Sequence, residues 1–217
     1  MRLTLVSPTY GHADPSAVRS RIRAAMFAAR HGVEWMDDVS YDREEWSSTR
    51  NLSWLDSMRH EIDGVMWIDS DMVIEPHFIH NLVNSGHGII GALCFDRRPP
   101  HDPVAWSGYP PRRIRQWSGE ILPVDGLGFG CLYTSSSSLS AVGGFDKHEW
   151  GEDYAWMEKA RKSGLQPYVD TSLRCGHLGP PTVITEMDYL MLRGEYRASP
   201  TLPPDVNPNK PGERWTN

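Results

Sequence analysis

Cysteine is scarce in this sequence and is not arranged for cross-linking. Cys94, Cys131 and Cys175 are odd in number, lie far apart and form no CxxC pair. Disulfide frameworks and structural zinc sites need paired or regularly spaced cysteines, so the pattern argues against both. We therefore expect reduced thiols, which favours a cytoplasmic protein.

Long apolar runs are missing as well. No stretch approaches the roughly 20 consecutive apolar residues that a membrane-spanning helix requires. The N-terminal segment MRLTLVSPTYGH has too short an apolar stretch for a secretion signal. The sequence therefore predicts no membrane span.

An excess of positive charge is the third absence. The chain has 22 Lys and Arg against 28 Asp and Glu, which gives a formal net charge of -6. This balance argues against a general affinity for nucleic acid or for anionic membranes. It leaves room for a local basic patch, and residues 97–118 hold five Arg and five Pro among Trp106, Tyr109 and Trp117. We expect a long loop or hairpin there.

What the chain does have is a regular alternation of strand and helix patterns. With 217 residues and 39% hydrophobic content, it can bury the core of one domain. We expect strands at 3–6, 33–41, 64–68 and 87–95, helices at 15–31, 48–62 and 75–86, and later a helix at 151–164 and a strand with a turn at 166–179. This alternation predicts an α/β domain with a mostly parallel sheet. We assign residues 1–198 to this domain and 199–217 to a Pro-rich tail.

The apolar residues of the first predicted helix recur at helical spacing. Val18, Ile22, Met26 and Ala29 form its apolar stripe, and Gly32 ends it.

The most informative motif follows a strand that reads as buried on both faces. Residues 64–68 are apolar, and Asp69 and Asp71 come directly after them. In open α/β sheets, ligands gather at the carboxyl ends of strands, and two carboxylates there are suited to a Mg²⁺ or Mn²⁺ ion that bridges to a diphosphate. The alternative is a turn that caps a helix starting near Glu75. These residues alone leave both interpretations open.

Three further motifs are ambiguous in the same way. The glycines of GLGFG, 126–130, would let the backbone approach a ligand closely, or they form a bulge. Glu152 and Asp153 either complement a helix dipole or include a general base. His177, between two glycines, is either a surface residue or a metal ligand.

Taken in order, these motifs resemble those of glycosyltransferases of the GT-A fold. The matching elements are DSD at 69–71, GLGFG at 126–130, GED at 151–153 and a late histidine, His177, after an N-terminal strand ending in SPTYG and a helix with TRN. The chain is most similar to small, single-domain, family-2-like enzymes, many of them encoded by bacteriophages, over about residues 3 to 180. The resemblance implies an α/β GT-A (nucleotide-diphospho-sugar transferase) fold with a mixed, mostly parallel sheet flanked by helices. It also implies transfer of a sugar from a nucleotide-diphosphate sugar, with UDP as the expected nucleotide, to an acceptor hydroxyl.

The resemblance implies a role for each matching residue. Mn²⁺ or Mg²⁺ would be bound by Asp71 directly and by His177, while Asp69 would contact the ribose or, through water, the metal. On the donor side, the resemblance places Thr9 and Tyr10 near the nucleotide base, Asp37 or Asp38 in contact with it, and Arg50 on the nucleotide. On the acceptor side, Gly128 to Gly130 would shape the pocket, Asp153 would be the base of an inverting transfer, and Glu152 would bind substrate hydroxyls. In a retaining enzyme, Glu152 and Asp153 would only bind substrate.

The kinship also bears on the acceptor and the compartment. A phage enzyme would act in the host cytoplasm, and its acceptor hydroxyl could belong to a hydroxymethylated base of DNA. The segment from Arg97 to Trp117 combines cations with flat rings, which suits phosphates and bases, although a solvated loop explains it equally well. A protein, a lipid-linked sugar and a cell-wall glycan are other acceptors.

Two other functions fit parts of the sequence. The two aspartates could belong to a phosphotransferase, but haloacid-dehalogenase-like enzymes place such a pair after their first strand and follow it with Gly-Thr. Here Met72 and Val73 follow. The other alternative is a non-catalytic module that binds nucleotide sugars or carbohydrate on the same fold.

Overall fold

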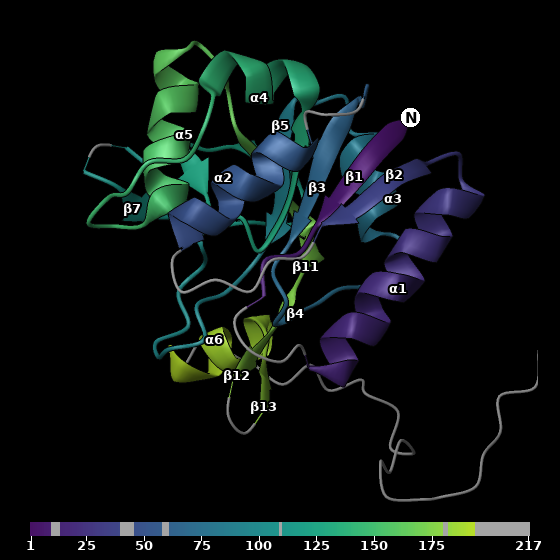
Figure 1. Cartoon of the computed structure of the whole chain (residues 1–217). Helices are drawn as coiled ribbons and strands as arrows, with labels where there is room; N and C mark the ends of the chain where they lie inside the picture. Colours follow the sequence, from purple (N-terminus) through teal and green to yellow (C-terminus); the bar gives the residue numbers. More distant parts are fainter. Residues whose placement is uncertain (10–13, 40–45, 58–60, 109, 180–181, 194–217) are drawn as a thin grey trace, which may run out of the picture.

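The computed structural model of the chain describes residues 1–9, 14–39, 46–57, 61–108, 110–179 and 182–193 (Figure 1). For residues 37–39, 46, 47, 49, 53, 56, 57 and 182 it describes the backbone only. The helices are α1 (Pro15–Arg30), α2 (Trp46–Ser57), α3 (Phe78–Val83), α4 (Ser136–Val142), α5 (Glu152–Lys162) and α6 (Glu186–Leu192). The strands are β1 (Arg2–Val6), β2 (Glu34–Val39), β3 (Gly64–Ile68), β4 (Met72–Val73), β5 (Ile89–Leu93), β6 (Ala105–Ser107), β7 (Arg112–Arg113), β8 (Ile121–Pro123), β9 (Gly126–Leu127), β10 (Cys131–Ser135), β11 (Tyr168–Arg174), β12 (Gly176–Gly179) and β13 (Thr182–Ile184). The predicted tail, 199–217, lies outside the described residues.

A seven-stranded sheet forms the centre of the molecule, in the order β2-β1-β3-β10-β5-β11-β8. Five of these strands run in one direction, and β10 and β8 run in the other. The predicted α/β class with a mostly parallel sheet is therefore confirmed. Two small sheets, β13-β12-β4 and β7-β6-β9, complete the fold.

Helices cover both faces of the central sheet, as Figure 1 shows for α1 on one side and α2, α4 and α5 on the other. The residues of β3 alternate between two cores: Val65 and Trp67 pack toward α4 and α5, whereas Met66 and Ile68 pack toward α1 and α3. A strand covered on both faces reads as a continuous apolar run, which is the pattern of residues 64–68. The strand that leads to Asp69 is thus fixed by packing on both sides.

The apolar stripe of α1 does not face the core as such a stripe normally does. Ile22 is 54% exposed and Met26 is 52% exposed. The buried side of α1 instead carries small residues, Ala17, Ser20, Ala24 and Ala28. Small side chains let the helix backbone lie close to its neighbours, and the Ser20 hydroxyl accepts a hydrogen bond from the Ile74 amide at 3.3 Å.

Two other helices, α4 and α2, also differ from the sequence-based expectation. The serine-rich stretch after β10 forms α4, which the sequence did not predict because serine is a weak helix former. The helix is held by the Ser135 side chain, which accepts a hydrogen bond from the Ser138 amide, and by buried Leu139 and Val142. The helix predicted at 48–62 ends at Ser57, and Leu55 is exposed.

No helix in the described part of the chain is long and apolar enough to span a membrane.

Candidate active site

The turn after β3 places Asp69 and Asp71 at the edge of the sheet. The Asp69 amide donates to the Gly130 carbonyl at 3.1 Å, and the Met72 amide donates to the Asp69 carbonyl at 3.1 Å. These bonds hold the turn between the Gly-rich segment and β4. Because β4 pairs with β12, Met72 lies opposite His177. The second aspartate and the late histidine, 106 residues apart, are therefore brought together by strand pairing.

Asp71 and His177 form a close pair, with 3.2 Å between Oδ2 and Nε2. The other ring nitrogen of His177, Nδ1, lies 2.8 Å from the Phe95 carbonyl, to which it donates. Burial raises the pKa of Asp71, but His177 and Arg97 outweigh it and hold that pKa below its ordinary value. Burial likewise lowers the pKa of His177, and the hydrogen bond to Asp71 with the charge of Asp71 reverses this and raises it. The two side chains present one oxygen and one nitrogen donor to the same space.

Asp69 faces a different partner. Its Oδ1 lies 3.2 Å from Nη2 of Arg50, a residue of α2. Within the described residues, no group of three or more His, Cys, Asp and Glu side chains is close enough to hold a metal ion. In this arrangement Arg50 binds the first carboxylate and Arg97 contacts the second at 3.3 Å. The metal set of Asp69, Asp71 and His177 stays a prediction.

Arg50 is the central cation of the site and is only 1% exposed. Its Nε lies 3.1 Å from Glu152 Oε1 and 3.4 Å from Asp153 Oδ1, in addition to the contact with Asp69. Its guanidinium also lies 4.9 Å from the centre of the Phe129 ring. Burial by itself lowers the pKa of Arg50, but the surrounding carboxylates outweigh burial and keep it above its ordinary value. The structure places Arg50 among acidic side chains. The nucleotide contact that the resemblance implies for Arg50 stays a prediction.

Glu152 and Asp153 open α5, but they do not cap it. The cap residue is Gly151, at φ 102°, with no side-chain hydrogen bond. Asp153 instead accepts a hydrogen bond from the Phe129 amide through Oδ2 at 3.1 Å. Burial raises the pKa of Asp153 to about 7, with Arg50 acting in the opposite direction and Glu152 adding to the rise. A carboxyl with a pKa near neutrality is suited to general base catalysis.

The Gly-rich segment 126–130 passes directly beside Asp153. A Cβ on Gly128 would lie 2.7 Å from Val104 Cγ1 and 3.4 Å from Asp153 Oδ2. A Cβ on Gly130 would meet only the sulfurs of Met72 and Cys94 as its nearest atoms, at 3.4 and 3.5 Å. Only the first of these two glycines is therefore required by close packing.

Gly128→Ala is expected to destabilise the protein by about 1–3 kcal/mol, because a methyl group 2.7 Å from Val104 Cγ1 would force the branched Val104 side chain to shift. The matched control Gly130→Ala should change the free energy of unfolding by less than about 1 kcal/mol. Urea unfolding of the two variants tests this, and equal losses would show that the close approach at Gly128 is not limiting.

One cavity of about 440 Å³ joins these elements. Its lining includes eight of the predicted site residues: Arg50, Asp69, Asp71, Gly128, Gly130, Glu152, Asp153 and His177. It also includes Asp96, Arg97 and Arg98, which follow β5. Asp96 went unnoticed in the sequence, although it follows a buried strand just as Asp69 does.

Of the predicted contacts to the nucleotide base, only Thr9 has a side chain that the structure describes, and Thr9 does not line this cavity. Thr9 bonds locally, with its hydroxyl donating to the Ser7 carbonyl at 3.2 Å. Tyr10 lies outside the described residues, as do the side chains of Asp37 and Asp38. The backbone of Asp37 and Asp38 lies in β2, paired with Thr4 and Leu5 of β1.

The Arg-rich segment is a hairpin of β6 and β7, as expected. Its rings, however, are not displayed for stacking: Trp106 is 8% exposed, and Trp117 packs on the core while donating to Glu186 at 2.7 Å. Arg113 lies over Trp106 at 5.8 Å, and Arg115 pairs with Asp102. Trp106 is therefore not available for stacking, and Trp117 is partly buried against the core. Tyr109 lies outside the described residues.

Comparison with known proteins gives structural matches only. No protein-family model matches the sequence, and no curated protein matches it either. The chain is similar to the crystal structure of A197 from STIV, with a TM-score of 0.57 and 16% identity over 87% of this chain and 92% of that one. It is also similar to the crystal structure of GalNAc-T7 with UDP, GalNAc and Mn²⁺, with a TM-score of 0.61 and 9% identity over 82% of this chain and 43% of that one.

At these identities the similarity establishes the fold. The chain has a GT-A-like fold, and this part of the sequence-based expectation is confirmed. The cavity lies at the edge where the buried strand β3 ends, which is the common ligand position in open α/β sheets.

Proposed function

We propose that the protein is a metal-dependent glycosyltransferase that moves a sugar from a UDP-sugar to an acceptor hydroxyl with inversion. The observation that carries the proposal is the placement of two chemically different groups in one cavity. Asp71 and His177 supply donors for a divalent cation, and Asp153 supplies a carboxyl whose pKa is near 7. The UDP and Mn²⁺ of the GalNAc-T7 structure support this assignment.

The side chains of Asp71 and His177 fit a Mn²⁺ or Mg²⁺ ion in chemistry and orientation. Because Nδ1 of His177 donates to the Phe95 carbonyl, its Nε2 is left to point at Asp71 and the cavity. Histidine ligands commonly have their second nitrogen fixed in this way. A bound cation would neutralise the charge that develops on the diphosphate leaving group. Arg97, now paired with Asp71, is an exposed cation that could turn to the same diphosphate.

Asp153 would remove the proton from the attacking hydroxyl. The Phe129 amide and the Arg50 guanidinium fix the orientation of its carboxylate. The third carboxylate on Arg50, that of Glu152, restrains the guanidinium from a second side. Attack on the side of the anomeric carbon opposite to the leaving diphosphate would invert the configuration. Arg50 thus positions the carboxylate of Asp153 and links the end of β3 to the start of α5.

The acceptor in this proposal is a hydroxyl compound, and DNA is the most specific candidate that the sequence predicts. Among the structural features of the hairpin, the exposed Arg98 and Arg112 support DNA, whereas the packed Trp106 and Trp117 do not.

The test of the proposal is a thermal-shift series of nucleoside diphosphates and UDP-sugars with and without Mn²⁺. A ligand at a hundred times its dissociation constant adds about 2.7 kcal/mol of stability, which is roughly 5–10 °C for a chain of this length. We expect such a shift with UDP plus Mn²⁺ and a much smaller one with UDP alone. Asp71→Ala and His177→Ala should each remove the metal-dependent part.

Asp96→Asn is the matched control. Asp96 lines the same cavity, but its carboxylate binds the amide and the guanidinium of Arg98 rather than the Asp71–His177 pair. This variant should keep the metal-dependent shift. If no nucleoside diphosphate shifts the wild-type protein, or if Asp71→Ala keeps the whole metal-dependent shift, the proposed donor site is wrong.

A further inference from the structure

The outward face of α1 carries two parallel rows of side chains. Helical geometry, at 100° per residue, places Ile22, Met26 and Ala29 in one row and Arg19, Arg23 and Arg30 in the next. All six residues are exposed. The row of arginines extends over eleven residue steps, from Arg19 to Arg30, or about 16 Å of helix. The helix therefore shows solvent an apolar edge beside a cationic edge.

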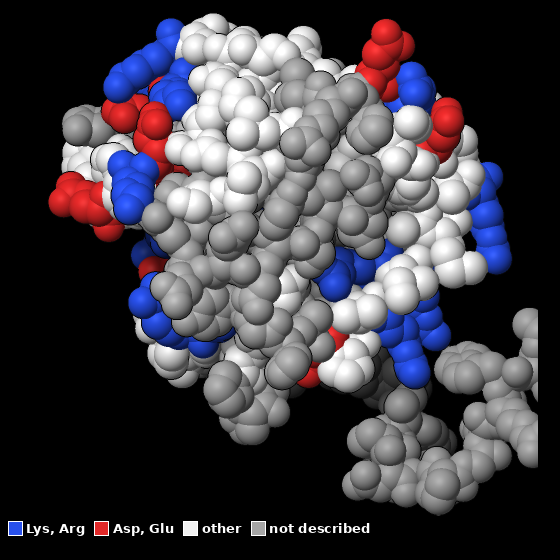
Figure 2. Space-filling model, in the orientation of Figure 1, with Lys and Arg blue, Asp and Glu red and all other residues white. Residues whose placement is uncertain are grey.

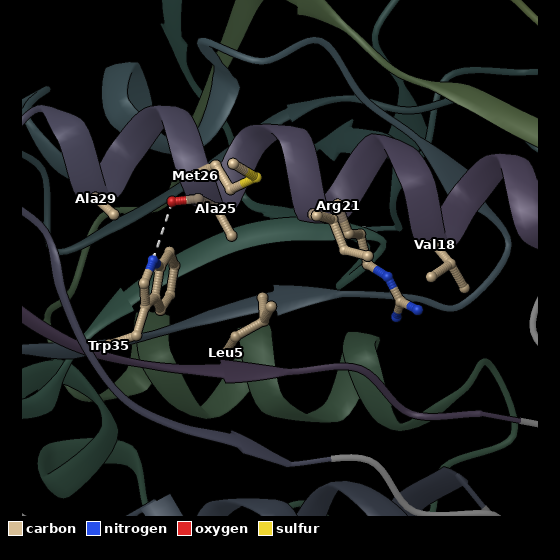
Figure 3. A pocket seen from close by; sticks show the side chains of 8 residues that line it. Leu5, Val18, Arg21, Ala25, Met26, Ala29 and Trp35 are labelled. Atoms are coloured by element: carbon tan, nitrogen blue, oxygen red, sulfur yellow. Dashed lines mark hydrogen bonds between the residues drawn. The ribbon is translucent and has the colours of Figure 1, made fainter.

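The apolar row continues into a groove of about 340 Å³ between α1 and the sheet. Leu5 and Trp35 line the other side of this groove, as Figure 3 shows. The Trp35 indole donates to the Ala25 carbonyl of α1 at 3.1 Å, so its ring is held in the wall of the groove. Arg21 also lines the groove, and the remaining lining is apolar. The exposed row and the groove together therefore form one mainly apolar strip along α1.

Among the described residues, Arg19, Arg23 and Arg30 form no ion pair, and α1 contains no Asp or Glu. Figure 2 shows blue side chains gathered over α1. The chain as a whole has a formal charge of -6, so this positive face stands apart from the rest of the charge distribution. A separation of charge of this kind orients a protein toward a negatively charged surface.

We propose that the outward face of α1, defined by these two rows, binds the surface of an anionic lipid bilayer. A helix that lies in the plane of a membrane buries an apolar edge at the acyl boundary and places arginines among the headgroups. The two rows on α1 have this arrangement. A second copy of the chain fits less well, because a symmetric contact through α1 would bring two rows of arginines together. A nucleic acid would use the arginines but leave Ile22 and Met26 in water.

The position of α1 gives the contact a consequence for the cavity. The N-terminal half of α1 borders β4: Arg19 and Arg23 share a hollow of about 450 Å³ with Val73 and Glu75. Val73 lies two residues after Asp71. A bilayer on α1 would therefore lie beside the strand that carries one side of the candidate active site. The binding itself does not depend on the proposed transfer.

The test is co-sedimentation with vesicles of equimolar phosphatidylglycerol and phosphatidylcholine, compared with vesicles of phosphatidylcholine alone. The full chain should bind the anionic vesicles, and binding should weaken at high salt. Arg19→Glu/Arg23→Glu should reduce the partition coefficient roughly tenfold or more, because each cation near the surface contributes about a factor of five. Ile22→Ser/Met26→Ser should reduce it as well, without changing the net charge.

Arg112→Glu/Lys162→Glu is the control, since it makes the same change in charge at exposed cations of β7 and α5. It should bind vesicles better than the α1 charge variant. All four changed residues of α1 are exposed, and an unchanged thermal midpoint would show that the variants fold. The proposal is overturned if the wild-type protein ignores anionic vesicles, or if the control loses as much binding as the α1 variants. It is also overturned if Arg19→Glu/Arg23→Glu weakens binding of an oligonucleotide, or Ile22→Ser/Met26→Ser abolishes a dimer, while vesicle binding is unchanged.

Discussion

Asp153→Asn is expected to lower the turnover of the proposed transfer by about 10²–10⁴-fold, the usual contribution of a general base. The amide is nearly isosteric with the carboxylate, and its oxygen can still accept the hydrogen bond from the Phe129 amide. What the variant lacks is the capacity to take a proton. Donor binding depends on the opposite side of the cavity, so the UDP-dependent thermal shift should remain.

The pKa of Asp153 predicts how wild-type activity depends on pH. Burial raises this pKa to about 7, and only the deprotonated form can act as a base. The value of kcat/KM should therefore rise with pH up to about 7 and level off above it. The same residue affects stability in the opposite direction: a carboxyl with a pKa higher in the folded than in the unfolded chain makes stability fall as pH rises between about 4 and 7. Above pH 7, Asp153→Asn should thus be more stable than the wild type.

Glu152→Gln is the matched comparison for this prediction. Glu152 lies next to Asp153 and binds the same guanidinium, but no backbone amide fixes its carboxylate within the described residues. Its loss should affect turnover less. It should move the pH rise to lower pH without abolishing it, because Glu152 adds to a pKa that burial raises most. If Asp153→Asn keeps wild-type turnover, or the rise persists in that variant, another group is the base.

The sequence predicted the placement of Asp71 better than that of Arg50, for a physical reason. Asp71 follows a buried apolar strand, and the carboxyl end of such a strand is a known edge of an α/β sheet, so local pattern and topology agree. Arg50 lies on a helix whose pattern gives no sign that its guanidinium is buried. Its partners Asp69 and Glu152 are 19 and 102 residues away, so only the folded chain reveals the charge cluster.

The orientation of α1 is a second feature that the sequence pattern alone does not decide. Periodicity locates the stripe of Ile22 and Met26 correctly, and a stripe of large apolar residues normally faces the core. Here the core accepts Ala24 and Ala28, because a helix with small residues can approach the sheet more closely. Periodicity reports which residues share a face, but the space left by neighbouring elements decides which face is buried.

Arg50→Met is expected to reduce the free energy of unfolding at pH 8 by about 3–5 kcal/mol, the usual cost of removing one partner of a buried ion pair. Methionine fills a similar volume, so loss of charge dominates over loss of packing. The guanidinium is the cation that opposes the raised pKa of Asp153, and Glu152 loses its contact at 3.1 Å as well. Without the guanidinium, the carboxylates of Asp69, Glu152 and Asp153 remain close to one another with no cation between them.

The pH dependence of this loss separates electrostatics from packing. Removing Arg50 raises the folded-state pKa of Asp153 further above its unfolded value, so the folded variant binds more protons than the unfolded chain. Its stability should then fall more steeply with rising pH than that of the wild type, and the loss at pH 5 should be smaller than at pH 8. Urea unfolding at both pH values measures this.

The surface control is Arg161→Met, which breaks an exposed ion pair with Asp125 at 2.9 Å. It should cost no more than about 1 kcal/mol of the free energy of unfolding. Equal losses for Arg50→Met at the two pH values would mean that Arg50 acts through packing, and its role in holding Asp153 would have to be abandoned.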